Sequence, residues 1–559
     1  MTNQSSIAIN ELVDEVEPTN EEIESLPHVS DRIPVNVWLI ILCEFAYGFA
    51  YYGLNGQFQN YIQFPVPDHN DGHHQPGALN KGQTVATSLT TFFRFYSALT
   101  SMVGAIVADQ YMGKYKTIVI SCFIYIIGLL ILLLTSIPQS LSIGLGMPGL
   151  IIAMLFLGLG TGGIKSNISS LMAEQYTRKK PFKKVSKRNI EVIISPSITT
   201  ESMFHYFYLV VSAGSLASIL TTLIEKYHSF WLSYLVPFVV FFIALIVLLT
   251  GRHRYVKIPP TGSLLVKSFN AIRTAFILRR KYGKTLPRMA SILDYSKPST
   301  YTSTKENFNW DDTFIENLKQ AFNASKIFLF FPIYSLCTNQ IHGNLISQAA
   351  QMNTGPLPND VINNIDPLIT ILLVPIFNKA LYPMLRKMKI NFHSILRITI
   401  GFYMVSIGMA WTAFVQSKIY QTNPDFNFSN PSNNLNAAWQ IPSYCFTALS
   451  HIFASISALE YAYVKAPSTM KSVVTSAYFI THAISSALGF VLLPVTVNPK
   501  LTWMYTALAC VAFIAGTLFL ICFHPRNAVV HVKEVENAVV IEQEKDKQVT
   551  FRTLSFVED

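Results

Sequence analysis

Apolar residues fill most of the chain in long blocks that short polar stretches separate. A helix that crosses a hydrocarbon core of about 30 Å needs about 20 mostly apolar residues. Blocks of this kind lie near 35–57, 84–110, 117–137, 146–173, 204–225, 229–250, 326–348, 363–386, 393–416, 439–464, 473–494 and 500–523. The pattern predicts an all-α integral membrane protein with twelve transmembrane helices, the second of which is interrupted by Arg94.

The polar stretches divide the chain into five segments. These are an acidic tail (1–34), a six-helix half (35–250), a basic linker (251–325), a second six-helix half (326–523) and a C-terminal tail (524–559). Two six-helix halves are typical of secondary transporters with the major facilitator architecture. Residues 264–284 of the linker fit a basic amphipathic helix on the inner leaflet, and a solvated linker explains them equally well.

Basic residues are distributed unequally between the loops. The loops after the second, fourth and eighth blocks are basic, with Lys114 and Lys116 in the first of them. The loops after the first, third, seventh and ninth blocks hold only Lys81 and Lys418. The positive-inside rule therefore predicts that both termini are cytoplasmic. In agreement, the acceptor sequon 427–429 lies on the predicted extracellular side, where glycosylation is possible.

The composition excludes an ordinary soluble protein. Charged residues make up 13% of the chain and hydrophobic residues 50%, against about 25% charged residues in soluble domains. The net charge of +10 comes from short basic clusters beside apolar blocks. This placement favours anionic lipid over nucleic acid as the partner. Because acidic residues precede the first block, we expect no cleaved signal peptide, and the first helix acts as its own anchor.

No enzyme signature occurs in the sequence. The glycines 158, 160 and 163 have dinucleotide-binding spacing, but they lie inside an apolar block rather than after a strand. The six cysteines lie in apolar stretches without disulfide or zinc spacing. We therefore expect no catalytic residues, no metal and no cofactor apart from a proton as coupling ion, and hence transport without ATP.

Polar residues inside the first half point to a cavity. An ionisable group at membrane depth is costly and by default a functional candidate. Glu44, Tyr47, Tyr51 and Asn55 lie on one face of a helix, which we expect to line the cavity; the alternative is a carboxylate that only helps assembly. Lys165 follows a glycine-rich stretch and either binds a substrate carboxylate, or pairs with Glu44 in an empty cavity, or reaches the cytoplasmic face.

Two further groups of polar residues stand out. Asp109 and Lys114 flank Gly113 where one predicted helix ends and the next begins, which indicates a conformational latch rather than a substrate contact. The candidates in the second half are Gln340, His342, Asn344, Gln348, Asp366, His451, Glu460 and His482. A histidine can relay protons near physiological pH, although a buried, hydrogen-bonded imidazole is the more ordinary explanation.

Several of these stretches resemble signatures of the proton-dependent oligopeptide transporters, in particular fungal di/tripeptide permeases. The matching stretches are 104–113 with 117–118 and Gly128, 160–167, 173–175, 251–257, 344–349 and 459–467. The resemblance runs from about residue 37 to residue 525. It implies the major facilitator fold, alternating access, and inward cotransport of small peptides with protons by a multi-pass monomer in the plasma membrane of a fungal cell, with a vacuolar membrane as the other possible address.

The resemblance also implies roles for individual residues. We expect Glu44 and Lys165 to take part in proton coupling. The side chains expected to bind the peptide are Lys165, Tyr52, Asn55, Tyr208, Gln340, Asn344, Ser335 and His451.

The sequence departs from the family pattern at charged positions. Tyr47 and Gly48 replace the second glutamate and the arginine of the first-helix pattern. Ser335 replaces a tryptophan, and His451 stands where the family has the glutamate that binds the peptide's amino terminus. Three functions remain open: a peptide permease with altered specificity or weakened proton coupling, a transporter of another small solute, and a non-transporting nutrient sensor.

Overall fold

A computed structural model describes most of residues 28–523. The gaps are 67–75, 179, 186–190, 261, 283–290, 302–307, 424–434, 468–469 and most of 378–392; before residue 28 only Pro18, Thr19, Glu22 and Leu26 are described. The predicted C-terminal tail and the sequon 427–429 therefore lie outside the described residues.

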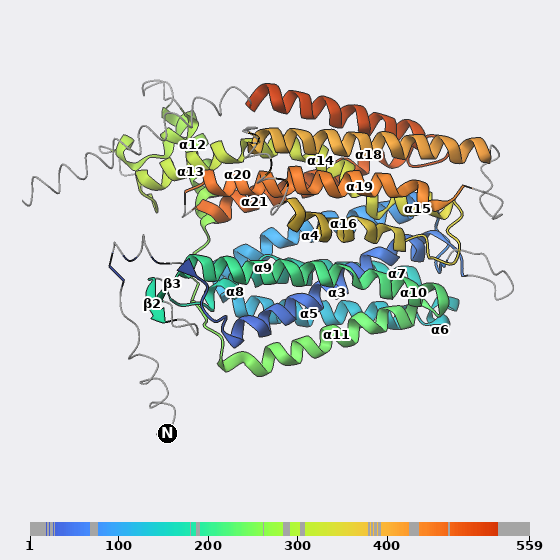
Figure 1. The fold of residues 1–559 in the computed structure, drawn as a ribbon, viewed down its shortest axis with the longest axis horizontal. Coiled ribbons are helices and arrows are strands. Elements are labelled where there is room, and N and C mark those ends of the chain that lie inside the picture. Colours follow the sequence, from blue (N-terminus) through green and yellow to red (C-terminus); the bar gives the residue numbers. More distant parts are fainter. Residues whose placement is uncertain are drawn as a thin grey trace, which may run out of the picture.

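The first half is a bundle of helices that run along the long axis of the molecule (Figure 1). Its helices are α3 (Val35–Gln63), α4 (Gly82–Val107), α5 (Lys114–Thr135), α6 (Pro138–Ser142), α7 (Gly146–Lys165), α8 (Ile168–Glu174), α9 (Pro196–Ser215), α10 (Ala217–Tyr227) and α11 (Phe230–Thr250). A π-helical turn, η1 (Ala108–Met112), ends the α4 segment. Lys114 and Lys116, which we expected in a loop, instead lie in the first turn of α5.

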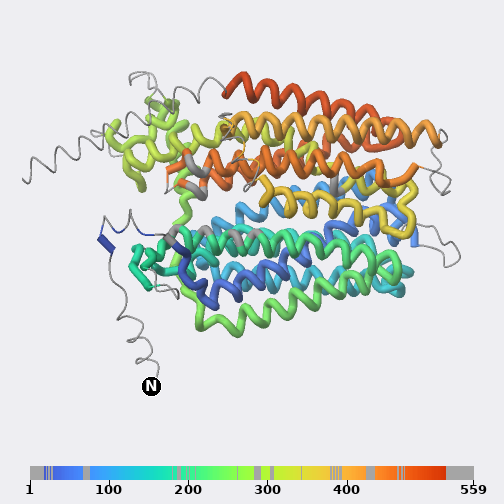
Figure 2. Tube along the Cα trace, viewed as in Figure 1, coloured from blue at the N-terminus to red at the C-terminus, as the bar shows by residue number. Residues whose placement is uncertain are grey.

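The second half lies beside the first, and Figure 2 shows the two colour ranges as neighbouring bundles. Its helices are α14 (Phe331–Thr338), α15 (Asn344–Ala350), α16 (Ile365–Ile376), α18 (Ser394–Thr422), α19 (Ile441–Ser450), α20 (Ser457–Lys465), α21 (Lys471–Leu492) and a last helix, Leu501–Phe523. Together the two bundles confirm the predicted all-α membrane fold.

Nine helices of the described residues are long and apolar enough to cross a membrane, and Val361–Ile376 is a shorter apolar helix. The predicted blocks 326–348 and 439–464 form helices that short turns interrupt. In the first, η6 (Asn339–His342) separates α14 from α15; in the second, η10 (His451–Ile456) separates α19 from α20. The count of twelve spans therefore stays a prediction.

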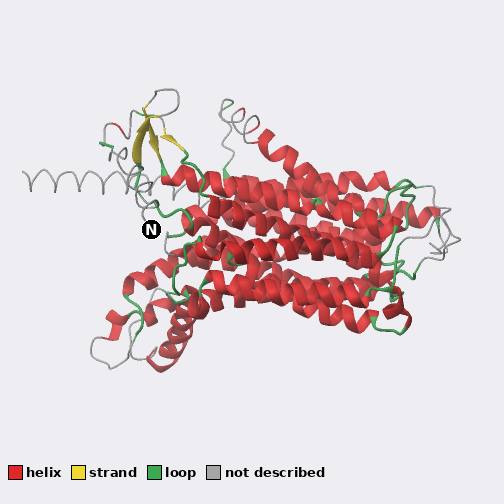
Figure 3. Cartoon of the chain, turned by 90° about the horizontal axis from the view of Figure 1, so that it is seen from below, coloured by secondary structure: helices red, strands yellow, loops and turns green. Residues whose placement is uncertain are grey.

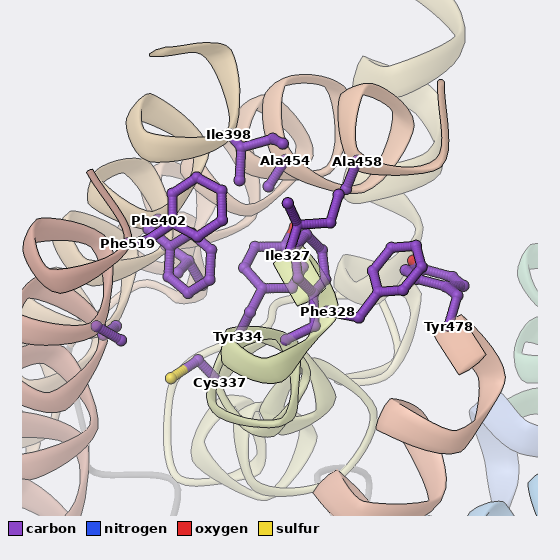
Figure 4. Packing of buried hydrophobic residues seen from close by; sticks show 14 of the residues in the cluster. Ile327, Phe328, Tyr334, Cys337, Ile398, Phe402, Ala454, Ala458, Tyr478 and Phe519 are labelled. Atoms are coloured by element: carbon purple, nitrogen blue, oxygen red, sulfur yellow. The ribbon is translucent and has the colours of Figure 1, made fainter. Parts of the chain in front are cut away.

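The second half is held by an aromatic core between α14, α18 and the last helix. The rings of Phe402 and Phe519 stack with their centroids 5.9 Å apart, and Phe331 meets Phe402 edge-on at 5.8 Å. Figure 4 shows Tyr334 beside this pair, with Cys337 one turn further along α14. Because these side chains are almost wholly buried, the core fixes the position of α14 and of the polar residues that follow it.

A small sheet lies at one end of the bundle (Figure 3). Its strands β1 (His28–Val29), β2 (Phe182–Val185) and β3 (Glu191–Ile194) have the order β1-β3-β2, parallel between β1 and β3 and antiparallel between β2 and β3. The pattern of apolar and polar residues does not predict these strands. Lys183 pairs with Glu22 at 2.9 Å, and the hydrogen bond from Lys183 lowers the pKa of Glu22. The acidic tail thus docks on the basic loop between α8 and α9.

The linker between the halves is folded. Of the two interpretations of residues 264–284, the helix is the one observed, as α12 (Leu264–Tyr282). Leu278 of α12 packs with Tyr295 and Tyr301, and α13 (Asp312–Ser325) follows. Phe269 and Phe276 of α12 are exposed. The position of this helix at the lipid surface stays a prediction.

Glycines let α4 and α7 approach closely. A Cβ atom added at Gly104 would lie 2.5 Å from the carbonyl oxygen of Gly162, and one added at Gly162 would lie 2.5 Å from the backbone of Thr100. The neighbouring atoms are backbone, which cannot rotate away. The glycine-rich stretch before Lys165 therefore sets where that lysine stands.

We expect Gly104→Ala to lower the midpoint of thermal unfolding in detergent, because the added methyl group overpacks a backbone contact at a cost of about 1 to 3 kcal/mol. Gly48→Ala is the matched control, since its Cβ would meet its nearest neighbours at 3.8 Å. Equal midpoints for the two variants would show that the contact between α4 and α7 can adjust.

Candidate functional site

Polar contacts between the two halves gather at one end of the bundle. Asn60 and Asn359 exchange two hydrogen bonds, of 2.7 and 2.9 Å, and Gln59 donates to Ser347 at 2.9 Å. Further contacts join Ser218 to Asn364, Lys226 to the carbonyl of Leu357 and Tyr227 to the carbonyl of Pro356. We call this set the inter-half seam. It lies on the predicted extracellular side, so the structure is closed there.

A polar cavity lies between the halves, next to the seam. Thr87, Thr90 and Arg94 of α4 line it from the first half; the second half contributes Gln340, Asn344 and Ser485, among others. Asn344 donates to Gln340 at 2.7 Å, and Thr87 donates to Asn344 at 3.2 Å. Sequence analysis named Gln340 and Asn344, and the structure places both in this cavity; their contact with a substrate stays a prediction.

Arg94 is a residue whose role sequence analysis missed. Its guanidinium group donates to the backbone carbonyl of Asn339, 2.9 Å away in the other half. The sequence showed Arg94 only as an interruption of an apolar block, although a charge at membrane depth is itself a signal for a functional site. The structure adds a cationic group to the cavity.

The predicted polar face of α3 lies next to Lys165. Glu44, Tyr47 and Asn55 are buried, with 4 to 8% of each residue exposed. The Lys165 ammonium nitrogen lies 5.7 Å from the centre of the Tyr51 ring, within the range of a cation–π contact. Lys165 thus turns toward α3. It is also exposed, which indicates that the space beside it is open to water.

Glu44 and Lys165 are close enough for their charges to interact, but no ion pair of 4.0 Å or less joins these two described side chains. Oxygen Oε2 of Glu44 is buried and has no hydrogen-bond partner in the described part of the chain. The lysine therefore stays available for a ligand in this conformation.

The remaining predicted binding residues differ in their placement. Tyr52 packs edge-on against Tyr51, with centroids 5.4 Å apart. Asn55 donates back to the carbonyl of Tyr51 in its own helix. Ser335 is fully buried and does not line the polar cavity, because its face of α14 packs inside the second half; this conformation gives no support to a substrate contact there. The side chain of Tyr208 lies outside the described residues.

His451 has an acidic neighbour that sequence analysis named without giving it a role. Its Nε2 atom lies 4.0 Å from Oδ2 of Asp366, and its Nδ1 atom lies 3.4 Å from the hydroxyl of Tyr334. Oxygen Oδ1 of Asp366 is buried and accepts no hydrogen bond from the described residues. Glu460 instead pairs with Arg397 at 3.2 Å and is half exposed. Asp366, rather than Glu460, is thus the carboxylate beside His451.

The residues of the predicted latch lie at the turn between α4 and α5 and contact α8 and the linker. Gly113 has a φ of +78°, as the turn between α4 and α5 requires. Lys114 pairs with Glu174 of α8, and the backbone carbonyl of Asp109 accepts from the amide of Gly262. The Lys114–Glu174 pair therefore ties α5 to α8. The latch role of Asp109, Gly113 and Lys114 stays a prediction.

The chain resembles known proteins over most of its length. The model of the POT family matches residues 115–509. A probable peptide transporter of Schizosaccharomyces pombe is 43% identical over 91% of this chain and 81% of its own length. A peptide transporter of Saccharomyces cerevisiae is 38% identical over 95% of this chain and 85% of its own.

Solved structures resemble the fold. The crystal structure of the POT family transporter PepTSo superposes with a TM-score of 0.68 at 19% identity, covering 88% of this chain and 98% of the other. A POT family transporter in complex with a thioalcohol-conjugated peptide superposes with a TM-score of 0.64 at 19% identity, covering 88% and 96%. At this identity the likeness supports the fold.

We expect the coupling free energy between Lys114 of α5 and Glu174 of α8 to be about 1 kcal/mol, because both side chains are mostly buried. The check is a double-mutant cycle of Lys114→Ala and Glu174→Ala on the thermal unfolding midpoint. The pair of Lys183 and Glu191, whose glutamate is 52% exposed, serves as the control cycle with a smaller coupling. Additive effects of the first two substitutions would exclude a stabilising contact.

Proposed function

The chain belongs to the POT family, and we propose that it imports di- and tripeptides together with protons by alternating access. The observation that carries this proposal is the distribution of charge around the space between the halves. Lys165 and Arg94 bring positive charge from the first half, while Asp366 brings a carboxylate from the second. A small peptide is a zwitterion, so its two ends match charges of opposite sign.

The conformation fits one state of an alternating-access cycle. The inter-half seam closes the predicted extracellular end, whereas Lys165, the last residue of α7, is exposed. A transporter that has closed behind its substrate and opens toward the cytoplasm has this arrangement. Amide and hydroxyl groups such as Gln340, Asn344 and Ser485 line the cavity and suit the peptide bond.

Two charged side chains of this chain can replace charges of the family pattern that are missing from its sequence. Gly48 stands where the family has an arginine, and Arg94 of the neighbouring helix α4 supplies a guanidinium group to the polar cavity. His451 stands where the family has a glutamate, and Asp366 supplies a carboxylate next to it. The substitution of charge argues for a working permease. No observation favours another solute or a sensor.

We also infer that the protein works as a monomer in the plasma membrane. Both walls of the polar cavity come from one chain, so a second copy is not needed to complete the site. Glu44, buried near Lys165, is our candidate for a proton-coupling carboxyl in the first half.

Removing the cation at Lys165 is expected to abolish dipeptide uptake, because the peptide carboxylate loses a charge-assisted contact. The measurement is uptake of a labelled dipeptide by Lys165→Gln in cells without their own permeases, with surface expression checked. Lys116→Gln, an exposed lysine at the start of α5, is the control. Uptake by Lys165→Gln at the wild-type rate would remove Lys165 from the site.

In the same uptake measurement, Arg94→Gln should raise the half-saturating dipeptide concentration by about ten- to a hundredfold.

Asp366 is expected to hold the peptide's amino terminus. Asp366→Asn should weaken competition by a free-amino dipeptide by about ten- to a hundredfold, the scale of a charged hydrogen bond. Competition by the N-acetylated dipeptide, which carries no ammonium group, should hardly change. Glu460→Gln is the control, because Glu460 pairs with Arg397 away from His451. An equal loss for both competitors would indicate a structural role for Asp366.

A further inference from the structure

Two carboxyl groups face each other across the inter-half seam. Glu225 lies near the end of α10 in the first half, and Asp360 directly precedes η7 (Val361–Asn364) in the second. Their exposed fractions are 3% and 1%. The two carboxyl groups lie within hydrogen-bond reach of each other. Neither residue was singled out by the sequence pattern, and neither belongs to the cavity described above.

The hydrogen bonds around this pair lack a donor. Asn60 donates to Oε1 of Glu225 at 3.1 Å, but Oε2 of Glu225 and both oxygens of Asp360 meet no donor in hydrogen-bond geometry among the described residues. An ionised carboxylate only accepts hydrogen bonds, and two adjacent carboxylates do not both stay ionised away from water. One proton on either carboxyl supplies the missing donor and joins the two residues.

The other groups around the pair do not supply that donor. Asn60 of α3, Tyr234 of α11 and Tyr444 of α19 face the pair with neutral side chains. Lys226 attracts Asp360, but its ammonium group donates to the carbonyl of Leu357 at 2.8 Å. The backbone amides of Asp360 and Val361 also lie near this carboxylate, but outside hydrogen-bond geometry. Burial raises the pKa of Asp360 in spite of these amides and of Lys226.

The position of the pair couples the proton to the conformation. Asn60, which donates to Glu225, also exchanges two hydrogen bonds with Asn359, the residue before Asp360. Any motion that separates the halves at this end must break these bonds, draw Glu225 away from Asp360 and admit water to both carboxyl groups. The proton is thus bound more tightly in the closed seam than in the open one.

We propose that Glu225 and Asp360 form a proton-binding site that closes the extracellular end of the transporter. The proposal rests on the alternating access and proton coupling of the proposed function, and it names where one proton acts. In the closed seam burial raises the pKa of Asp360 and favours the protonated pair, whereas water in the open seam returns the pKa of Asp360 toward its ordinary value near 4. Stabilisation of the closed seam is therefore complete below about pH 4 and is lost as the pH rises through the raised pKa of Asp360.

The test follows the opening of this end directly and needs no substrate. Spin labels are placed at Ser142 and Gln421, which are exposed near the predicted extracellular end, one in each half. The full chain is used in lipid nanodiscs, with the less buried Cys445, Cys510 and Cys522 replaced by alanine. Distance distributions from pulsed electron resonance at about pH 5 and about pH 8 give the ratio of closed to open molecules.

For the parent protein we expect this ratio to fall by up to about tenfold for each unit of pH over this range, as the release of one proton requires. The variant Glu225→Gln with Asp360→Asn carries its own amide donors, so its ratio should not change with pH. Asp360→Asn alone is measured as well, in case the double variant is not obtained. Glu191→Gln, at the opposite end of the molecule, should respond like the parent.

Two results would overturn the proposal: a pH response in Glu225→Gln with Asp360→Asn equal to that of the parent, or no response in the parent. Both are independent of the substrate, so they can be told apart from a failure of peptide transport. If the pH response depends on the pair but labelled dipeptide is not taken up, the proton site stands and the proposed substrate is wrong.

Discussion

The hydrogen bonds that join the two halves near the predicted extracellular face organise the rest of the structure. They are made by side chains, Asn60 with Asn359 and Gln59 with Ser347, rather than by apolar packing. In an apolar surrounding, a buried polar group is costly unless it has a partner. The polar side chains of the seam must therefore either pair with each other across the two halves or be hydrated. Because these are two distinct states, the seam is suitable as a gate.

The proposed peptide-binding groups and the proposed proton-binding pair lie in different places. Lys165, Arg94 and Asp366 carry the charges that we propose for the two ends of a zwitterion. Lys165 is exposed, Arg94 donates to a carbonyl of the other half, and Asp366 lies beside His451. Glu225 and Asp360 instead lie at the seam and are sealed from water. In our proposal the peptide and the gating proton therefore bind at different groups, which the motion of the halves connects.

The helix bundle supplies the rigidity that this motion requires. Glycines at the α4–α7 contact bring the backbones together in the first half, and aromatic rings such as Phe402 and Phe519 fill the second. Each half is packed by its own side chains, while many contacts between the halves are polar; the rings of Phe95 and Phe490 also meet across them. On the predicted cytoplasmic side, Lys183 ties the acidic tail to the basic loop, and α12 and α13 connect the halves. Such halves can rotate as bodies without losing their cores.

The sequence by itself determined the membrane class, most of the helices and the residues that share one helical face. Glu44, Tyr47 and Asn55 could be grouped because a helix repeats every 3.6 residues, and this periodicity depends only on neighbours in the chain. Lys165 could be named because a charged residue inside an apolar block is conspicuous in a hydropathy profile of the sequence. The resemblance to peptide permeases rested on local motifs of the same kind.

Only the tertiary structure decided which distant residues meet. The contacts of Asp366 with His451 and of Arg94 with Asn339, and the closeness of Glu225 to Asp360, join helices far apart in the sequence, and no local pattern encodes them. The strand at His28–Val29 pairs with residues near 193 for the same reason. Ser335 faces the core because α14 is rotated by its aromatic packing, which a motif cannot show. Periodicity sets the face of a helix, whereas the packing of all helices together sets what that face touches.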